Sequence, residues 1–318
     1  MERKIYFRGS PLGIHKLTHT EDRTPTAVII TGASSGIGKA CALHLDKKGF
    51  MVFAGVRKAS DGIELYDKSS GRITPLPVDV TVPQSVEEAK LKVIQIIAKR
   101  GIVLDLVNNA GITIGGPLEF LAPEDLKTEL EVNLIGVVRV TQAFLPMIRQ
   151  FKGRIVNMSS TSGLIAFPFL GPYAASKFAL EAISDSWRIE LMPWGITVSI
   201  IEPGDVATPI WDKSLTLIDH MVKHWPEQAF KLYGPIMALH DKIKRHGIPP
   251  EEVAKAVEHA LSSRHPRPRY RVGQHRVLMD VVRRLPSGIR DRIIARQLPR
   301  YGSQQVMQTS KAENSKAL

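Results

Sequence analysis

Short runs of apolar residues alternate with longer stretches of helical periodicity between residue 26 and about residue 204. Six runs of five or six residues are apolar enough for buried strands. They are Ala27–Thr31, Met51–Val56, Ile73–Val78, Val103–Val107, Arg154–Met158 and Thr197–Ile201. The stretches with apolar residues at helical spacing are Gly38–Lys48, Val82–Arg100, Pro123–Gln150 and Tyr173–Met192. This alternation predicts βαβ units and an α/β fold, a doubly wound parallel sheet with helices on both faces.

The alternation ends after residue 204. Residues 205–247 are rich in aromatic residues and methionine, and a helix is predicted at Pro250–Ser262. An extended run follows at Arg269–Val272, and two short helices are predicted at Val277–Leu285 and Ile289–Leu298. The pattern therefore predicts one domain over residues 26–272 with an inserted lid at 205–247. It leaves an N-terminal extension at 1–25 and a basic C-terminal extension at 273–318.

The composition excludes several classes of protein. A chain of 318 residues with 43% apolar residues can bury a large core without disulfides or metal. The single cysteine, Cys41, excludes an intrachain disulfide framework, and the ten histidines show no metal-ligand spacing, so no metal is expected. No 18 uncharged apolar residues occur in a row, and residues 1–25 lack the apolar core of a secretory signal. We therefore expect a cytoplasmic protein without a signal peptide or a transmembrane segment.

The net charge of +12 is concentrated near the C-terminus. Residues 264–300 hold eleven arginines against two acidic residues, a balance of +9 that leaves +3 for the rest of the chain. This distribution argues against nucleic-acid binding over the whole surface, and no nucleic-acid partner is expected. The two basic helices fit peripheral contact of residues 277–298 with an anionic membrane, and they fit a solvated face packed on the domain equally well.

A glycine-rich segment, Thr31-Gly32-Ala33-Ser34-Ser35-Gly36-Ile37-Gly38, follows the first predicted strand and opens the first helix. Phosphate binding requires close approach of the backbone and a helix N-terminus whose free N–H groups face the anion. Gly32, Gly36 and Gly38 would supply the tight turn, the close approach and the close packing of helix on strand. A glycine cluster alone is weak evidence, but this position between strand and helix predicts a Rossmann-type dinucleotide site.

The end of the second predicted strand points to the type of cofactor. In NAD-binding proteins, an acidic residue there accepts a hydrogen bond from the adenosine ribose 2′-hydroxyl. The stretch Val52–Lys58 contains no acid and ends in Arg57 and Lys58. Because a guanidinium offers a fork of donors to a 2′-phosphate, Arg57 predicts NADP rather than NAD. The plainer interpretation is that Arg57 is an exposed residue leaving a strand.

Several motifs taken in order resemble the short-chain dehydrogenase/reductase family over residues 26 to about 208. They are Thr31–Gly38, Asn108-Asn109-Ala110-Gly111, Asn133, Ser160, Tyr173 with Lys177, and Pro203-Gly204. Within the family, residues 185–204 look most like the branch of retinol, 17β-hydroxysteroid and 3-hydroxybutyrate dehydrogenases. The resemblance implies an NAD(P)-dependent oxidoreductase that acts on CH–OH groups. It also implies a dimer or tetramer formed through residues 123–150 and 173–192.

Tyr173 and Lys177 are four residues apart and would lie on one face of a helix. A free tyrosine has a pKa near ~10, and a neighbouring ammonium favours the phenolate and lowers that pKa. Tyr173 is therefore expected to donate a proton in reduction and to accept one in oxidation. Ser160 lies thirteen residues before Tyr173, and this spacing selects Ser160 over Ser159 as the partner of the substrate oxygen. By resemblance, Lys177 would also bind the nicotinamide ribose, and the backbone of Asn133 would hold a relay water.

Each of these residues also has a plainer interpretation. Ser160 could form a turn, Tyr173 could be a packed aromatic, and Lys177 could be a solvated surface residue. The side chain of Asn133 could satisfy buried backbone groups. Because the four occur in the right order, the catalytic interpretation is favoured.

The resemblance implies further cofactor contacts. Asp79 and Val80 would lie at the adenine, residues 109–111 along the adenosine ribose, and Thr208 at the nicotinamide carboxamide. Asp79 would otherwise cap the turn before Pro83, and Asn108 would bridge strands. The residues expected at the cofactor are Gly32, Ser34, Ser35, Gly36, Ile37, Gly38, Arg57, Asp79, Val80, Asn109, Ala110, Gly111, Tyr173, Lys177, Pro203, Gly204 and Thr208.

The predicted lid, residues 205–247, is strongly apolar and predicts a lipophilic substrate. Phe167 and Trp211 are expected to line the substrate site beside Ser160, so the leading candidates are steroid, retinoid or lipid-like alcohols and ketones. Plain packing of the lid on the domain is the alternative for many of these side chains. Two rival functions stay open, an NAD-linked dehydrogenase of a small hydroxy acid and a non-catalytic nucleotide-sensing protein. The absence of an acid near Arg57 argues against the first, and the intact catalytic residues argue against the second.

Overall fold

The computed structural model describes residues 26–97, 101–209, 225–233, 247–274, 276–296 and 298. The expectations for residues 1–25, for most of the lid including Trp211, and for residues 299–318 fall outside the described residues.

Seven parallel strands form the sheet, in the order β3-β2-β1-β4-β5-β6-β7. Their bounds are β1 Thr26–Ile30, β2 Met51–Val56, β3 Ile73–Pro77, β4 Val103–Asn108, β5 Arg154–Met158, β6 Thr197–Pro203 and β7 Arg269–Val272. The order reverses between β1 and β4, so the loops after these two strands meet at a topological switch point. Ligands of doubly wound sheets bind at such points. The expected Rossmann-type fold is confirmed.

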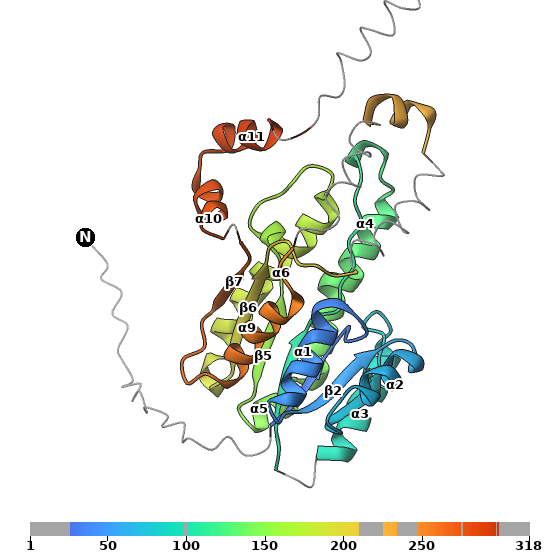
Figure 1. Cartoon of the computed structure of the whole chain (residues 1–318), viewed down its shortest axis with the longest axis vertical. Coiled ribbons are helices and arrows are strands. Elements are labelled where there is room, and N and C mark those ends of the chain that lie inside the picture. The colour runs from blue at the N-terminus through green and yellow to red at the C-terminus, as the bar shows by residue number, and fades with distance from the viewer. Residues whose placement is uncertain are drawn as a thin grey trace, which may run out of the picture.

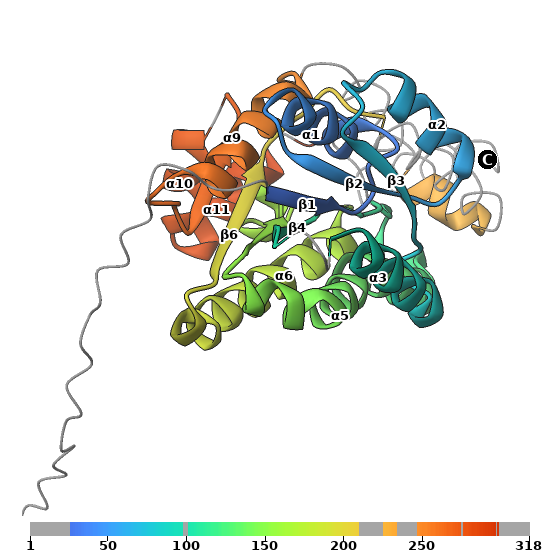
Figure 2. The same cartoon turned by 90° about the horizontal axis from the view of Figure 1, so that it is seen from below.

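Helices cover both faces of the sheet, as Figures 1 and 2 show. One face carries α1 (Gly36–Lys47), α2 (Ala59–Asp67) and α9 (Pro250–Ser262). The other carries α3 (Pro83–Ile97), α5 (Gly136–Gln150) and α6 (Gly171–Glu190). Alternate side chains of β1 enter the two cores, because successive residues of a strand point to opposite faces. Val28 and Ile30 join the core under α1 and α9, and Ala27 and Ile29 join the core on the opposite face.

The sequence pattern does not predict α2. This helix buries only Gly62 and Leu65, and it exposes Ile63 and Tyr66, so it lacks a clear apolar stripe. A Cβ on Gly62 would lie 2.7 Å from Cβ of Pro75, and the glycine therefore lets the helix pack closely on β3.

The stretch predicted as one helix, 123–150, contains three parts: α4 (Pro123–Leu130), a π-helical turn (Glu131–Ile135) and α5. Such turns inside α-helices are frequent at functional sites, and Asn133 lies in this one. By length and composition, 123–150 is the one helical stretch within the described residues that is able to cross a membrane. In the fold, its α5 part buries Val140, Phe144 and Ile148 in the core on one face of the sheet.

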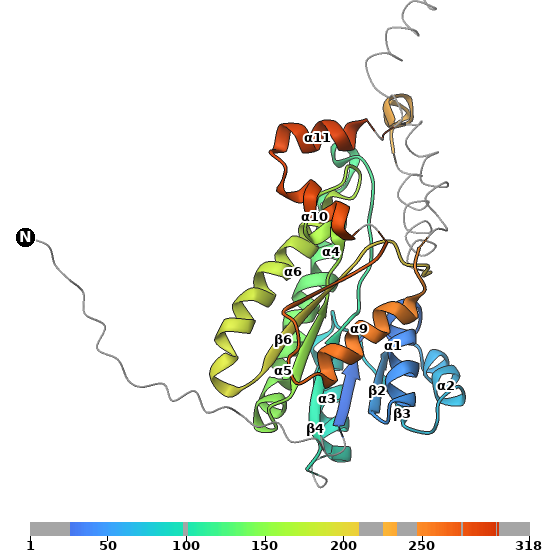
Figure 3. The same cartoon turned by 60° about the vertical axis from the view of Figure 1, so that its left-hand side comes forward.

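Two short helices, α10 (Arg276–Arg284) and α11 (Ser287–Ala295), extend beyond the end of β7 (Figures 1 and 3). They lie at the same end of the molecule as the helical segment 227–233. Asp280 of α10 pairs with Arg271 of β7, and it also pairs with Arg283 at 3.0 Å. The described residues of α11 include no buried side chain. The basic extension is therefore tied to the sheet edge through α10 and leaves α11 exposed.

Candidate active site

The glycine-rich loop connects β1 to α1 at the switch point. The Oγ1 atom of Thr31 accepts hydrogen bonds from the backbone N–H groups of Asn109 (2.9 Å) and Ala110 (3.0 Å). Gly32 has a φ of +66°, and a Cβ on it would lie 2.8 Å from Cα of Ala110. Two segments predicted separately from the sequence, the glycine-rich loop and the NNAG element, are thus held directly against each other.

The start of α1 has the features that an anionic group requires. A Cβ on Gly38 would strike the carbonyl of Gly32 and the side-chain amide of Asn109, so only glycine fits between helix and loop. Gly36 has a φ of +54° and lies beside Thr208, whose Cβ would be 3.1 Å from an added Cβ. Ser35 precedes the helix without a capping bond from its side chain to the first-turn N–H groups. This close backbone and the helix N-terminus fit the pyrophosphate of a dinucleotide.

The adenosine end of the predicted site is formed by the residues after β2 and β3. Arg57 is exposed directly after β2, and Asp79 is half-buried after β3. Partial burial alone raises the pKa of Asp79, but hydrogen bonds from Thr81 and the charges of Arg57 and Arg139 hold it below its ordinary value. Oδ1 of Asp79 accepts from the Thr81 N–H (2.9 Å) and hydroxyl (2.7 Å), so this carboxylate caps the turn.

Val80, the neighbouring residue, is held by α5. Its carbonyl accepts a hydrogen bond from the guanidinium of Arg139, which also pairs with Glu131 at 2.7 Å. The loop predicted to contact the adenine is therefore fixed to the helix that begins just after Asn133.

Ser160, Tyr173 and Lys177 come together at the carboxyl end of β5. Oγ of Ser160 accepts from the N–H of Ser162 at 3.1 Å, and the Ser160 hydroxyl acts to lower the pKa of Tyr173. Lys177 donates from Nζ to the carbonyl of Met158, the last residue of β5, at 2.9 Å. Its Nζ lies 5.6 Å from the centroid of the Tyr173 ring. The helix spacing of Tyr173 and Lys177 and the strand end that carries Ser160 thus converge on one site.

The pKa values in this cluster are governed mainly by burial. Burial raises the pKa of Tyr173 to about 12; the hydrogen bond from Ser160 opposes the shift and the charge of Glu129 adds to it. This is the reverse of the direction expected from a neighbouring ammonium, because desolvation of the phenolate outweighs that attraction. Burial also lowers the pKa of Lys177 to about 8, against the charges of Glu129 and Glu181.

The side chain of Asn133 is buried and braces the segment after the NNAG element. Its Oδ1 accepts from the N–H of Ile112 and its Nδ2 donates to the carbonyl of Ile112, each at 2.9 Å. Nδ2 also lies 3.0 Å from Oγ of Ser176 on α6. The side chain therefore satisfies backbone groups, as the plainer interpretation expects. A Cβ on Gly111 would lie 3.2 Å from Oδ1 of Asn133 and 3.8 Å from Nζ of Lys177, which places this segment beside the lysine.

Three further predicted positions are placed by the fold. Nδ2 of Asn108 donates to Thr141 and to Asn157, each at 2.9 Å, so Asn108 bridges β4, β5 and α5. Pro203 ends β6, and the N–H of Gly204 donates to the carbonyl of Val272 at 2.8 Å.

The described part of the lid lies over two loops next to the site. Tyr233 makes edge-to-face contacts with Phe169 and Phe120, at centroid distances of 6.1 and 6.0 Å. A Cβ on Gly116 would lie 3.0 Å from the ring of Trp225. Phe167, predicted at the substrate, is half-buried in the loop between Ser160 and Tyr173. Trp211 lies outside the described residues.

Sequence reasoning missed one polar group in the cluster, the carboxylate of Glu129. This residue of α4 is fully buried and contacts the side chain of Asn133. The available signal was its position four residues before Asn133, which places both side chains on one face of a helix.

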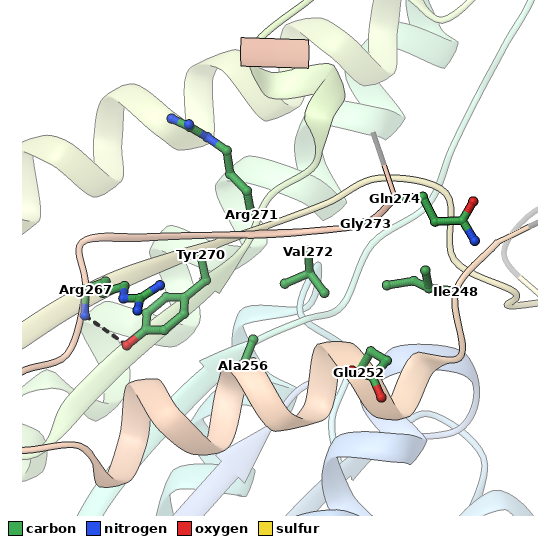
Figure 4. A pocket seen from close by; sticks show the side chains of 9 residues that line it. All are labelled: Ile248, Glu252, Ala256, Arg267, Tyr270, Arg271, Val272, Gly273 and Gln274. Atoms are coloured by element: carbon green, nitrogen blue, oxygen red, sulfur yellow. Dashed lines mark hydrogen bonds between the residues drawn. The ribbon is translucent and has the colours of Figure 1, made fainter. Parts of the chain in front are cut away.

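A separate pocket of about 380 Å³ lies between β7 and α9 (Figure 4). Tyr270 and Val272 point from β7 toward α9, and Arg271 points away (Figure 4). The hydroxyl of Tyr270 accepts from the N–H of Arg267 at 2.9 Å and lies 2.8 Å from Nδ1 of His259. The residues that line this pocket include none of the predicted cofactor or catalytic residues.

The comparisons with known proteins agree on one family. A family model described as short chain dehydrogenase matches residues 26–216. The chain is 36% identical to retinol dehydrogenase 5 of Mus musculus, over 86% of this chain and 89% of the mouse protein. It is 37% identical to the mitochondrial D-beta-hydroxybutyrate dehydrogenase of Bos taurus, over 84% of this chain and 83% of the bovine protein.

A solved structure of a short-chain dehydrogenase from Streptomyces avermitilis has a TM-score of 0.68 at 27% identity and covers 86% of this chain and 95% of its own. In the part of the chain that the structure describes, no group of three or more His, Cys, Asp or Glu residues is placed to hold a metal ion. The chain therefore belongs to the short-chain dehydrogenase/reductase family, in the branch of retinol and hydroxysteroid dehydrogenases, and is an oxidoreductase that acts on CH–OH groups of small molecules with a nicotinamide cofactor.

Proposed function

We propose that this protein is an NADP-dependent oxidoreductase that interconverts a lipophilic alcohol and its ketone or aldehyde, of the steroid, retinoid or lipid-like class. The observation that carries the proposal is the meeting of Ser160, Tyr173 and Lys177 beside Gly111, next to the glycine-rich loop. When bound, the nicotinamide supplies or accepts the hydride.

The residues of this cluster have distinct roles in the proposed reaction. Tyr173 donates its phenolic proton to the substrate carbonyl oxygen in reduction and accepts a proton in oxidation. Ser160 donates a hydrogen bond to the same oxygen. The ammonium of Lys177 stabilises the phenolate and binds the nicotinamide ribose. The backbone of Asn133, in the π-helical turn, holds the water that exchanges protons with Lys177.

In this proposal the cofactor binds across the topological switch point, at the carboxyl ends of the strands. Residues 32–38 bind the pyrophosphate, residues 109–111 line the adenosine ribose, and Asp79 with Val80 borders the adenine. Pro203, Gly204 and Thr208 border the nicotinamide; the closeness of Thr208 to Gly36 supports this. Arg57 binds the 2′-phosphate. Its exposure after β2 and the absence of an acid at that strand end support this assignment.

The lipophilic substrate class is supported by the aromatic residues that the lid brings over the loops near Tyr173. Phe120, Phe169 and Tyr233 form one such cluster. Phe167, half-buried in the loop before Tyr173, is assigned to the same proposed substrate wall. The similarity to mouse retinol dehydrogenase 5 favours a lipophilic substrate. The similarity to the bovine D-beta-hydroxybutyrate dehydrogenase favours the second candidate, an NAD-linked dehydrogenase of a small hydroxy acid.

Turnover of carbonyl compounds of graded size distinguishes the two candidates. The full chain is assayed with retinal, a steroid ketone and acetoacetate, each with NADPH and with NADH. Because each buried CH2 contributes about 0.8 kcal/mol, a few extra buried carbons raise kcat/KM by about 100-fold. We expect the larger apolar carbonyls with NADPH to be the best substrates. Preference for acetoacetate with NADH would establish the second candidate instead.

Apolar residues on the outer surface support a homo-oligomer. Ile135, Phe178 and Ile189 are 43%, 44% and 63% exposed on the π-helical turn and α6. We assign this face to contact with a second copy of the chain. Light scattering should then give the mass of a dimer or tetramer, and Ile189→Asp should reduce it.

The C-terminal extension, residues 273–318, supports contact with a membrane surface. Leu278, Val281 and Ile289 are at least half exposed on α10 and α11, among the arginines of the same helices. These helices lie at the same end of the molecule as the lid segment 227–233 (Figure 3). We therefore propose a cytoplasmic protein with a catalytic domain at 26–272 and peripheral attachment to anionic membranes through 277–298.

A further inference from the structure

Glu129 is a fully buried carboxylate beside the proposed active site. It lies on α4, one helical turn before Asn133, and the proposed reaction gives it no role. Burial of a carboxylate is costly unless donors surround it, and an apolar residue would fill the same space without that cost. The contacts of this group therefore indicate what it does.

Both oxygens of Glu129 accept hydrogen bonds from groups that shape the site. Oε2 accepts from the backbone N–H of Ile114 at 2.6 Å, and Oε1 accepts from Nδ2 of Asn133 at 2.7 Å. Asn133 in turn holds both backbone groups of Ile112. Hydrogen bonds to an ionised carboxylate are about twice as strong as neutral ones. Glu129 and Asn133 together fix residues 112–114, which continue directly from Gly111 beside Lys177.

Glu129 also lies near the titrating groups of the site, because an added Cβ on Gly111 would lie 3.2 Å from Oδ1 of its partner Asn133 and 3.8 Å from Nζ of Lys177. Lys177 is faced by Glu129 from α4, by Glu181 from its own helix and by the Met158 carbonyl from β5. Tyr173 is faced by Ser160, by Glu129 and by Nζ of Lys177, which lies 5.6 Å from its ring centroid. Burial raises the pKa of Glu129 to about 8. The hydrogen bonds from Ile114 and Asn133 and the charge of Lys177 act to lower it. Each charge of this pair favours the other, because Lys177 lowers the pKa of Glu129 and Glu129 raises the pKa of Lys177.

We propose that Glu129 is a positioning residue of this oxidoreductase, whose carboxylate fixes Asn133 and residues 112–114 and whose negative charge sets the pH range in which Lys177 and Tyr173 hold their protons. This inference rests on the proposed function, because its effect is read from the proton transfer assigned to Tyr173. It adds an acidic group on α4 to the residues that control that transfer.

The test is the pH dependence of kcat/KM for the full chain, in reduction and in oxidation, with Glu129→Gln. Removal of a negative charge lowers the pKa of every group that it faces. Reduction requires protonated Tyr173, so the reductase activity of Glu129→Gln should fall at a lower pH than that of the wild type as pH rises. Oxidation requires the phenolate, so its activity should rise at a lower pH. Loss of one unit charge should shift both pH profiles, the falling limb of reduction and the rising limb of oxidation, by about one pH unit.

Two further variants make the result specific. Glu124→Gln removes an exposed carboxylate of the same helix, which pairs with Lys127 at 3.5 Å, and should leave both pH profiles in place. Glu129→Asp keeps the charge and shortens the reach to Asn133 and Ile114. It should lower kcat and leave the limbs within about 0.3 pH units of the wild type.

The possible outcomes separate this inference from the function on which it rests. If Glu129→Gln lowers activity equally at every pH, or if Glu129→Asp shifts the limbs as far as Glu129→Gln does, the charge has no role and the inference is wrong. If Glu129→Gln does not fold, a shift of the limbs in Glu129→Asp still overturns it. A wild type without turnover of any carbonyl compound would overturn the proposed function and this inference together.

Discussion

Tyr173 lies where burial and hydrogen bonding act in opposite directions on one hydroxyl. Burial raises its pKa to about 12, although the Ser160 hydroxyl favours the phenolate. At neutral pH the free protein therefore holds Tyr173 protonated, in the state that donates to a carbonyl. Lys177, with its pKa lowered to about 8 by burial, retains much of its positive charge under the same conditions.

Arg57 is the single residue expected to select the cofactor. In Arg57→Asp, the guanidinium contact with the 2′-phosphate is lost and a repelling charge replaces it. A hydrogen bond to a charged group contributes about 2 kcal/mol, so the ratio of kcat/KM with NADPH to that with NADH should fall about 30-fold. Steady-state kinetics with both cofactors measures this ratio.

The matched control is Arg292→Asp, the same charge reversal at an exposed residue of α11, which should leave the ratio unchanged. If the ratio is equally unaffected by Arg57→Asp, Arg57 does not contact the 2′-phosphate and the NADP assignment fails.

At this scale, residue spacing carried most of the information that could be predicted. The positions of Ser160, Tyr173 and Lys177 along the chain, combined with the expected strand and helix, were sufficient to bring them together. Glu129 was not found in this way, because its position four residues before Asn133 does not show that it is buried, whereas Glu124 of the same helix is exposed. Only the packing of α4 against residues 112–114 buries it.

The helices α1 and α9 pack side by side on one face of the sheet and share a polar contact. Glu258 of α9 accepts from Nε2 of His44 at 2.6 Å and pairs with Nζ of Lys48 at 3.0 Å. Partial burial raises the pKa of Glu258, but these two bonds hold it below its ordinary value. This contact joins the helix that begins at the glycine-rich loop to the helix that precedes β7.

The depressed pKa of Glu258 makes this stabilisation dependent on pH. A carboxyl with a lower pKa in the folded state contributes stability above its unfolded pKa, and loses it as pH falls through the folded value. Glu258→Gln should lower the free energy of unfolding by about 1 kcal/mol at pH 7, and the difference should disappear between about pH 5 and pH 3. Urea unfolding of both proteins at several pH values measures it. A difference that stays constant down to pH 3 would assign the loss to packing instead of charge.

The strands β2 and β5 begin and end at the residues predicted from the sequence. Their bounds could be predicted because nearly every residue in each strand is buried. Two local features could not be predicted in this way. The helix α2 exposes two of its large apolar residues, and the π-helical turn around Asn133 changes the backbone bonding inside an uninterrupted apolar pattern. Both depend on contacts with other elements, Pro75 in one case and residues 112–114 with α6 in the other.

Most of the net positive charge of the molecule lies in the C-terminal segment and not among the proposed catalytic residues. The arginines of residues 264–300 account for most of the net charge of +12. The inner ones, Arg269 and Arg271, form ion pairs with Glu202 of β6 at 3.2 and 2.9 Å. The α11 arginines lie on a helix that buries no described side chain. The sequence located this charge but did not indicate which arginines the fold would pair.

Binding to lipid vesicles tests the proposed role of the arginines on α11. The full chain should sediment with vesicles of phosphatidylserine and phosphatidylcholine, and should be released by 1 M salt, where electrostatic screening acts over only about 3 Å. Each arginine near an anionic surface contributes about 1 kcal/mol, so Arg290→Glu with Arg292→Glu should weaken binding by more than about 30-fold. Binding that resists both salt and the double variant would contradict attachment through these charges.

The central claim is that Tyr173 transfers the proton to the substrate, while cofactor binding does not depend on the Tyr173 hydroxyl. The most direct measurement compares Tyr173→Phe with the wild type in two assays, NADPH binding by fluorescence and NADPH oxidation with the best carbonyl substrate. General acid catalysis contributes about 10²–10⁴-fold, so kcat should fall by about 1,000-fold while the Kd for NADPH changes less than about threefold. Turnover by Tyr173→Phe at the wild-type rate would contradict the account.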